Sequence, residues 1–242
     1  MGQIGVADLH VHTSASDGSD APEAVVRWAD RVEIDVLAIT DHDVIDGAIS
    51  AREVAITEDL RTEVIVGEEV STLDGHVLGL FLEEPVPPGM CAARTVEAIH
   101  RQGGLAVAAH PFWRAGELDR RAYSYSVGSR LLDVEFDAVE VVNGSFNPAI
   151  AAANRRAAEV NADLLLPAIA ASDAHVKELI GCSYTAFPGR TAADLGAALR
   201  GGLTVPGRSR YRLSGLSRGV TWLATYALRA RLRAIPAPAE PA

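Results

Sequence analysis

The sequence predicts an α/β barrel, in which short buried strands alternate with helices around one sheet. The first observation is a set of short, continuously apolar segments, such as residues 36–40, which are typical of strands buried on both faces. The second is that helical patterns separate these segments, which favours parallel pairing through right-handed crossovers. The third is that polar residues of metal-ligating types follow where the apolar segments end, and such barrels carry their sites there.

The composition fits one large domain. The chain has 242 residues, of which 48% are hydrophobic, so it can bury a full core as a single barrel-sized unit. The formal net charge of -10 argues against nonspecific binding of nucleic acid by the body of the protein. Cys91 and Cys182 lie far apart and indicate neither a disulfide framework nor a thiolate zinc site. The sequence shows no signal peptide and no membrane-length apolar run, so we expect a cytoplasmic protein.

The first half of the chain predicts four strands and three helices. The first strand starts at Ile4, and the helix after it takes Asp20 as its N-cap, has Pro22 in its first turn and ends near Arg31. Residues 73–75 have the composition of a hairpin turn. The other predicted elements of this half are strands at 36–40, 64–66 and 76–81 and helices at 47–58 and 92–101.

The second half predicts five more strands, and glycine pairs mark where two helices end. Gly103-Gly104 ends the helix before this half, and Gly201-Gly202 ends the last helix of the barrel. The predicted elements are strands at 105–109, 138–142, 165–171, 184–187 and 203–205 and helices at 148–159 and 191–200.

The strongest local signal is the pair His10 and His12 at the end of the first strand. Alternate residues of a strand point to the same face, so both imidazoles emerge together and need only one or two carboxylates to hold a divalent ion. Taken alone, the pair is about equally compatible with a surface pair or a hydrogen-bonded strand tip. The other strand ends favour the metal site. The candidate ligands are His10, His12, Asp17, His42, Glu69, His76, His110, Asp173 and His175.

These nine residues exceed what one ion can use. Nitrogen and carboxylate ligands suit two or three hard or borderline divalent ions, such as zinc, manganese or iron, and the lack of thiolates disfavours a purely structural zinc site. His100 lies at a polar helix end, where a solvated side chain is the better interpretation. The set therefore indicates a catalytic metal centre.

The motifs resemble those of the PHP (polymerase and histidinol phosphatase) family of metal-dependent phosphoesterases. Residues 8–18, with Asp-Leu-His-Val-His-Thr and Ser-Asp-Gly, are similar to its first motif, and residues 40–43, 109–111 and 172–175 to three others. Residues 67–71 are similar to its bridging-glutamate strand, which favours Glu69 over Glu68, and His76 resembles the histidine that follows. The resemblance spans about residues 6–188. It implies a distorted (β/α)7 barrel of the PHP type with a trinuclear metal site at the carboxyl rim of the strands.

The resemblance also implies a role for each candidate ligand. Asp8 would orient a ligating histidine, and Glu69, Asp173 and His175 would form the catalytic set. The ions would turn water into a metal-bound hydroxide and offset charge on the phosphate oxygens, with no nucleophilic side chain. The implied ion sites are His10, His12, Glu69 and Asp173 for the first, Glu69, His76 and His110 for the second, and Asp17, His42 and His175 for the third.

The branch of the family that looks most similar includes nucleoside-monophosphate phosphatases and short-RNA 5′ exonucleases. Related phosphatases often carry a long helical insertion between His76 and His110, whereas here 33 residues intervene, so we expect a reduced cover over the site. Arg114 can clamp a phosphate and Trp113 can stack on a base, although an exposed loop arginine is as compatible. We expect nucleotide-like monoesters, nucleoside 3′,5′-bisphosphates or short oligonucleotides as substrates.

Two other functions compete with this hypothesis. An amidohydrolase also begins with His-x-His at a strand end, but it bridges two metals with a lysine carbamate on a middle strand. The only lysine here is Lys177, beyond the last motif. The second alternative is a noncatalytic module that the metals stabilise and that binds a partner, which the complete ligand set disfavours.

The C-terminal segment differs from the predicted barrel, which we place at residues 1–205. Residues 206–242 contain seven arginines between Arg208 and Arg233, whereas the chain up to Leu199 has 31 acidic residues against 14 basic ones. We expect a basic helix that packs on the acidic barrel, followed by a Pro/Ala tail. The alternative is a helix that binds a partner, nucleic acid or a membrane surface.

Overall fold

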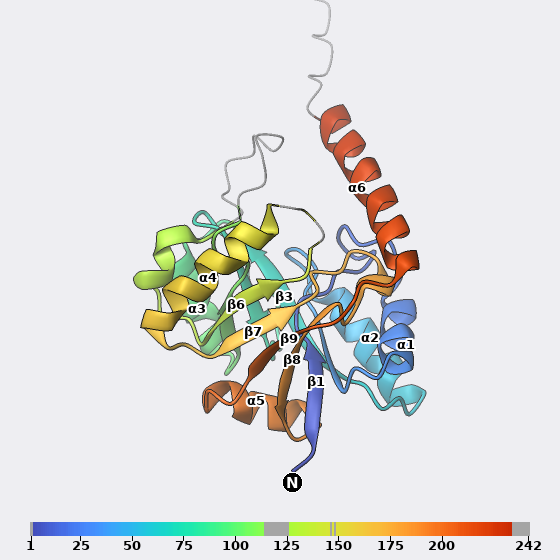
Figure 1. Ribbon diagram of the computed structural model, residues 1–242, viewed down its shortest axis with the longest axis horizontal. Coiled ribbons are helices and arrows are strands. Elements are labelled where there is room, and N and C mark those ends of the chain that lie inside the picture. The colour runs from blue at the N-terminus through green and yellow to red at the C-terminus, as the bar shows by residue number, and fades with distance from the viewer. Residues whose placement is uncertain (1, 114–125, 146, 148, 234–242) are drawn as a thin grey trace, which may run out of the picture.

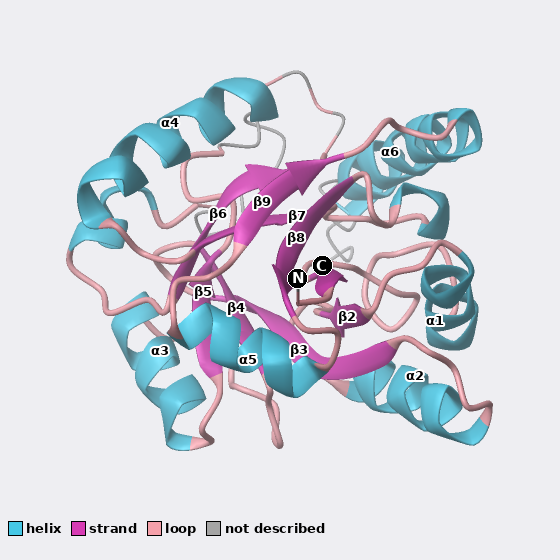
Figure 2. Cartoon of the chain, turned by 60° about the horizontal axis from the view of Figure 1, so that its bottom comes forward, coloured by secondary structure: helices cyan, strands magenta, loops and turns pink. Residues whose placement is uncertain are grey.

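In the computed structural model, one nine-stranded sheet curls into a nearly closed barrel that carries helices on its outer face (Figures 1 and 2). The structure describes residues 2–113, 126–145, 147 and 149–233, and the side chains of the last helix as far as Leu228. The strands are β1 (Ile4–Asp8), β2 (Val36–Ile39), β3 (Glu63–Ser71), β4 (His76–Leu80), β5 (Leu105–Ala108), β6 (Ala138–Asn143), β7 (Ala168–Ala171), β8 (Ser183–Pro188) and β9 (Val205–Arg208). The α-helices are α1 (Pro22–Arg31), α2 (Asp46–Thr57), α3 (Ala92–Arg101), α4 (Ile150–Leu164), α5 (Ala192–Arg200) and α6 (Leu213–Arg233).

The strand order is β7-β6-β5-β4-β3-β2-β1-β8-β9. The β1-β2-β3 and β5-β6-β7 neighbours are parallel, as predicted, whereas β4, β8 and β9 run antiparallel to their neighbours. The barrel closes through side chains at the β7 edge. The Thr185 hydroxyl donates to the carbonyl of Ala170 at 2.8 Å, and the Thr204 hydroxyl donates to that of Ala168 at 2.8 Å.

The apolar residues form two clusters, one outside the sheet and one inside it. The outer cluster lies between the sheet and α1, α2 and α3. The inner cluster takes alternate residues of the strands, such as Ile65 of β3 and Val107 of β5, and α5 adds Leu195 and Leu199 to it. Helix α5 thus covers one end of the barrel, as Figure 2 shows, and the polar strand ends lie at the other.

Several predicted element boundaries are wrong. The N-cap of α1 is Ala21, without a side-chain cap, because the Asp20 carboxylate binds Lys177 and Arg218 instead. Helix α4 runs on to Leu164, and Leu165 follows in the left-handed region with φ 58°, so β7 starts only at Ala168. Strand β3 continues to Ser71 because it pairs with β4 along its end, and β9 starts at Val205.

Helix α6 extends from the barrel beyond the other helices in Figure 1. Among the described residues, no helix is both long and apolar enough to cross a membrane. The two cysteines are free, with Cys91 exposed and Cys182 buried.

Candidate metal centre

The loops that follow the strands bring the predicted ligands together. His10 and His12 lie just beyond β1, and a parallel bridge pairs Val11 with Ala174, so this loop runs beside the loop after β7. A second parallel bridge pairs His42, beyond β2, with Glu69 of β3. Strand pairing therefore continues past the regular ends of the strands and carries the polar side chains to one rim.

Glu69 lies at the centre of this rim, and its two carboxylate oxygens face different histidines. Oε1 is 2.7 Å from Nδ1 of His76 and 3.0 Å from Nε2 of His110. Oε2 is 3.1 Å from Nε2 of His10, 3.3 Å from Nε2 of His12 and 3.4 Å from Nδ1 of His42. The neighbouring Glu68 points the other way and accepts the main-chain N–H of Val86. One carboxylate thus reaches two separate sets of imidazoles.

Asp173 provides the second buried carboxylate. Its Oδ1 lies 3.2 Å from Nε2 of His12 and 3.5 Å from Nε2 of His10. Asp173 has a φ of 52° and His110 a φ of 27°, both in the left-handed region that non-glycine residues seldom adopt. Such strained positions concentrate at functional sites, where the surrounding structure holds them. We call His10, Glu69, His76, His110 and Asp173 the inner group.

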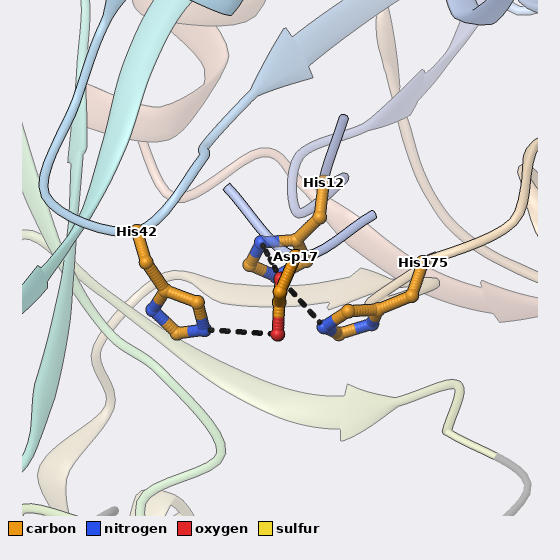
Figure 3. A group of neighbouring side chains, drawn as sticks. All are labelled: His12, Asp17, His42 and His175. Carbon is orange, nitrogen blue, oxygen red and sulfur yellow. Dashed lines mark ion pairs between the residues drawn. The ribbon is translucent and has the colours of Figure 1, made fainter. Parts of the chain in front are cut away.

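The remaining predicted ligands lie nearer the surface and form what we call the outer group: Asp17, His42 and His175. Nε2 of His175 is 3.3 Å from Oδ1 of Asp17, and Nε2 of His42 is 4.0 Å from Oδ2 of Asp17 (Figure 3). His12 lies between the groups, because its Nδ1 is 3.6 Å from Oδ1 of Asp17 while its Nε2 faces Glu69. The structure therefore brings all nine predicted ligands to one rim.

The charges of the two groups are strongly coupled. Burial alone would lower the pKa of His10, but the carboxylates of Asp173, Glu69 and Glu140 hold it well above its usual value. Burial would also lower the pKa of His12, but the nearby carboxylates of Asp173 and Glu69 outweigh it and raise this pKa to about 10. Burial would raise the pKa of Glu69, whereas His42, His76 and His10 hold it well below its usual range. Without metal, protons on His10 and His12 offset the charge of the buried carboxylates.

Divalent ions fit the donors of this rim. Within the described part of the chain, both ring nitrogens of His12 and Nδ1 of His110 are buried without a well-formed hydrogen bond, which is costly for polar atoms unless a cation takes their lone pairs. The described residues also form four sets of possible metal ligands, and within each set the donor atoms lie within 4.8 Å of one another. These sets are His12, Asp17, His42 and His175; His10, His12 and Asp173; His10, Glu69 and His110; and His42, Glu69 and His76.

Glu140, which the sequence motifs did not indicate, holds the inner group in place. This buried residue of β6 accepts a hydrogen bond from Nδ1 of His10 at 3.2 Å and one from the main-chain N–H of His110 at 2.7 Å. The amide of Asn143 then links Glu140 to Asp173, donating to each at 3.1 Å. The available signal was a single charged residue inside an otherwise apolar strand.

Among the described residues, Asp8 makes no hydrogen bond to a histidine, which corrects the role that the resemblance implied. Its carboxylate accepts the main-chain N–H groups of Ser172 at 2.9 Å and Gly181 at 2.8 Å, and burial raises its pKa to about 6. Asp8 thus fixes the loop after β7, whereas Glu140 orients His10.

The acidic residues beside His42 stabilise loops. Asp41 accepts hydrogen bonds from Thr13 and from the Ser16 hydroxyl, which holds the loop that carries Asp17. A side chain at Gly18 would meet the main chain of His12 at 2.6 Å, so the turn after Asp17 needs glycine. Asp43 accepts the main-chain N–H of Ser71 at 2.7 Å.

Of the other residues discussed in the sequence analysis, His100 and Lys177 lie apart from the candidate ligands, whereas Trp113 lies beside one of them. His100 pairs with Asp137 at 2.7 Å and lies outside the donor sets, and Lys177 pairs with Asp20 at 3.0 Å. The ring of Trp113 meets that of His110 edge-on, with centroids 5.5 Å apart. Arg114, the predicted phosphate clamp, lies outside the described residues.

The comparisons with known proteins agree with this arrangement. A model of the PHP domain matches residues 8–103, and a model named PHP-associated matches residues 151–204. An uncharacterized protein of Methanocaldococcus jannaschii is 34% identical over 148 residues, which cover 57% of this chain and 81% of that protein. A two-domain protein of Bacteroides vulgatus, described as containing a predicted PHP-like metal-dependent phosphoesterase, has the same fold, with a TM-score of 0.68, 21% identity and coverage of 86% of this chain and 65% of that one.

Two relatives have named activities. The phosphoribosyl 1,2-cyclic phosphate 1,2-diphosphodiesterase of Eggerthella lenta is 35% identical over 130 residues, which cover 50% of this chain and 45% of that enzyme. The 5′-3′ exoribonuclease Rnm of Escherichia coli is 40% identical over 82 residues, covering 32% of this chain and 28% of the exoribonuclease. The chain thus spans less than half of either enzyme. The matched models, these relatives and the histidine and carboxylate rim together show that the chain belongs to the PHP family of metal-dependent phosphoesterases.

Proposed function

We propose that the chain hydrolyses nucleotide-like phosphate esters with two or three divalent ions held by the nine rim residues. The observation that carries this proposal is the position of Glu69, whose Oε1 faces His76 and His110 while its Oε2 faces His10 and His12. A carboxylate placed in this way can bridge two cations. Nitrogen and oxygen donors without thiolates suit zinc, manganese or iron(II).

The side chains of the rim have separable roles in this chemistry. When bound, the ions supply Lewis acidity, which lowers the pKa of water and offsets negative charge on phosphate oxygens. Glu69 and Asp173 contribute the negative charge that allows several cations to share one site. Glu140 accepts the Nδ1 proton of His10 and so leaves the Nε2 lone pair for the centre. The burial of His10 and Glu69 keeps bulk water away and strengthens these interactions.

The proposed substrates are mononucleotides, nucleoside 3′,5′-bisphosphates and very short oligonucleotides. The names of these two relatives indicate that they act on a phosphoribosyl cyclic phosphate and on RNA, both of which are phosphate esters of ribose. The chain up to Leu199 has 31 acidic residues against 14 basic ones, which disfavours binding of a long polyanion along the barrel. Trp113 lies beside His110, where an aromatic ring can stack on a base, and Arg114 follows it in the sequence.

A cleavage assay on a ladder of nucleotides tests the substrate. The full, metal-loaded chain is given a mononucleotide, a nucleoside 3′,5′-bisphosphate and RNAs of increasing length at several salt concentrations. We expect cleavage to be fastest for the shortest substrates and nearly independent of salt, because few phosphates are bound. Efficient and strongly salt-sensitive cleavage of long RNA would refute the small-substrate proposal.

A turnover in isotope-labelled water tests the chemistry. Because the proposed nucleophile is water, the label is expected in the released phosphate, and no phosphorylated protein should form. Trapping a covalent phosphoenzyme, or finding the label only in the alcohol product, would contradict the proposal.

A further inference from the structure

Trp222 of α6 contacts two of the three residues of the outer group. Its indole N–H donates to the main-chain carbonyl of Asp17 at 2.7 Å. Its ring packs on the imidazole of His175, with centroids 4.0 Å apart and an angle of 37°. His175 in turn stacks on His12 at 4.1 Å and 20°. A residue far along the chain thus touches both the carboxylate-bearing turn and a histidine of the candidate metal centre.

The outer group has weaker support from the sheet than the inner group has. The side chains of Asp17 and His175 are 25% and 14% exposed, whereas those of Glu69 and His10 are 2% and 0% exposed. Asp17 lies in a turn, and His175 lies beyond the isolated bridge at Ala174. Asp41 holds the loop of Asp17, and Nδ1 of His175 lies 3.1 Å from the main-chain oxygen of Asp173. The contacts with Trp222 add support to both residues from outside the sheet.

Helix α6 is anchored so that Trp222 has a fixed position. Arg218, one turn before Trp222, binds Glu178 at 2.6 Å and Asp20 at 3.1 Å. Gly215 lies so close to the 3-10 helix at Lys177–Leu179 that a side chain there would meet the Glu178 carbonyl and Leu179 at 2.9 Å. One turn after Trp222, Tyr226 stacks on it with centroids 5.2 Å apart. Positions 215, 218, 222 and 226 share one helix face, and this face meets the barrel.

We propose that Trp222 is a positioning residue for the ion held by Asp17, His42 and His175, and that α6 thereby completes the metal centre. The inference rests on the proposed function, since it concerns one of the proposed ions. The indole N–H fixes the turn that carries Asp17, and the indole ring restricts the rotation of His175. Without Trp222 these two ligands lose a support that restricts their geometry, while the donors of the inner group keep theirs.

The test measures zinc binding to the full chain and needs no turnover. Zinc bound per chain is measured by mass spectrometry after dialysis against buffers of graded free zinc. For Trp222→Ala we expect one ion to bind about 10- to 100-fold more weakly, the range seen when a group that orients a ligand is lost, and the others to bind as before. Trp222→Phe keeps a ring on His175 but loses the N–H, so a smaller loss of the same ion is expected.

Leu223→Ala is the matched control, because this neighbouring side chain is 42% exposed and should leave every ion unchanged. A chain with His175→Ala already lacks a ligand of this ion. Adding Trp222→Ala to that chain should not lower the affinity for the remaining ions further. Unchanged binding of every ion to Trp222→Ala would overturn the proposal, as would an equal loss of all ions, which indicates a structural role.

The folding of each variant is checked by circular dichroism of the metal-free chain. If Trp222→Ala does not fold, Trp222→Phe decides the question: selective weakening of one ion supports the proposal, and unchanged binding refutes it. A wild-type chain that binds zinc but hydrolyses no phosphate ester would refute the proposed function alone, and the zinc data would still decide the role of Trp222.

Discussion

The inner and outer groups of the candidate metal centre are positioned in different ways. Glu69 and His76 lie within paired strands, His10 and His110 just beyond strand ends, and their side chains are at most 9% exposed. In contrast, Asp17, His42 and His175 lie on loops with 25%, 28% and 14% exposure. The comparison indicates that the sheet determines most of the inner geometry and places His42, whereas Asp17 and His175 also depend on contacts from distant parts of the chain.

Removing Glu69 should have the largest effect. Glu69→Ala deletes the carboxylate that faces five histidines. Loss of a group that only orients a ligand costs up to about 100-fold, so we expect turnover to fall by more than this when the ligand itself is lost. The matched control is His100→Ala, since His100 pairs with Asp137 away from the rim. Rates of phosphate release decide this prediction. If both variants lost activity equally, the assigned ligands would be wrong.

Glu140→Gln should have the next largest effect, because it weakens the support of the inner group without removing a ligand. Glu140 accepts from His10 Nδ1 with one carboxylate oxygen and from the His110 N–H with the other. The amide of glutamine keeps only one accepting oxygen, so at least one of these two hydrogen bonds is lost. We expect zinc affinity to fall by about 10- to 100-fold, measured by dialysis against graded free zinc. An affinity equal to that of the wild type would show that Glu140 does not orient His10.

His175→Ala should affect the outer group alone. His175 lies 3.3 Å from Asp17, and its contact with the inner group is through Nδ1, which is 3.1 Å from the main-chain oxygen of Asp173. No donor set of the described residues joins His175 to His76 or His110, so one ion should be lost while the rest stay bound. The ratio of bound zinc to protein measures this. Complete loss of zinc would contradict the separation of the two groups.

Asp20→Asn should have a smaller effect, on stability. Hydrogen bonds from the Lys177 main chain, from its ammonium and from Arg218 outweigh burial and lower the pKa of Asp20. A lowered pKa stabilises the fold above about pH 4, the usual value for aspartate, and this contribution is lost as the pH falls through the folded-state pKa. We expect Asp20→Asn to lower the free energy of unfolding by about 1–2 kcal/mol at pH 7.

The pH dependence separates this effect from a general loss of packing. Denaturant unfolding at pH 7 should show the difference between Asp20→Asn and wild type, and the difference should shrink at acid pH. An undiminished difference at low pH would contradict the electrostatic explanation.

The parts of the centre that could be predicted from the sequence are those that the strands position, and the parts that could not depend on contacts between distant residues. His10, His42, His110 and Asp173 could be found because each follows a short apolar strand, and parallel strand ends converge. Glu140 was missed because no local sequence pattern shows whether a charged residue within a buried strand orients a metal ligand or has only a structural role. The Trp222 contact joins residues 205 positions apart and the Arg218–Asp20 pair joins residues 198 apart, so no local pattern indicates either. The same long-range pairing explains why Asp20 does not cap α1.

A metal-loading titration tests the claim that the rim of the barrel is a metal-dependent phosphoesterase centre. The full chain is stripped with a chelator, reloaded in steps with zinc, manganese or iron(II), and assayed at each step for bound metal and for phosphate release from a mononucleotide. We predict no turnover in the stripped chain and a rise in activity that is complete at two or three bound ions. Full activity of the stripped chain, or a wild-type chain that binds no divalent ion, would contradict the claim.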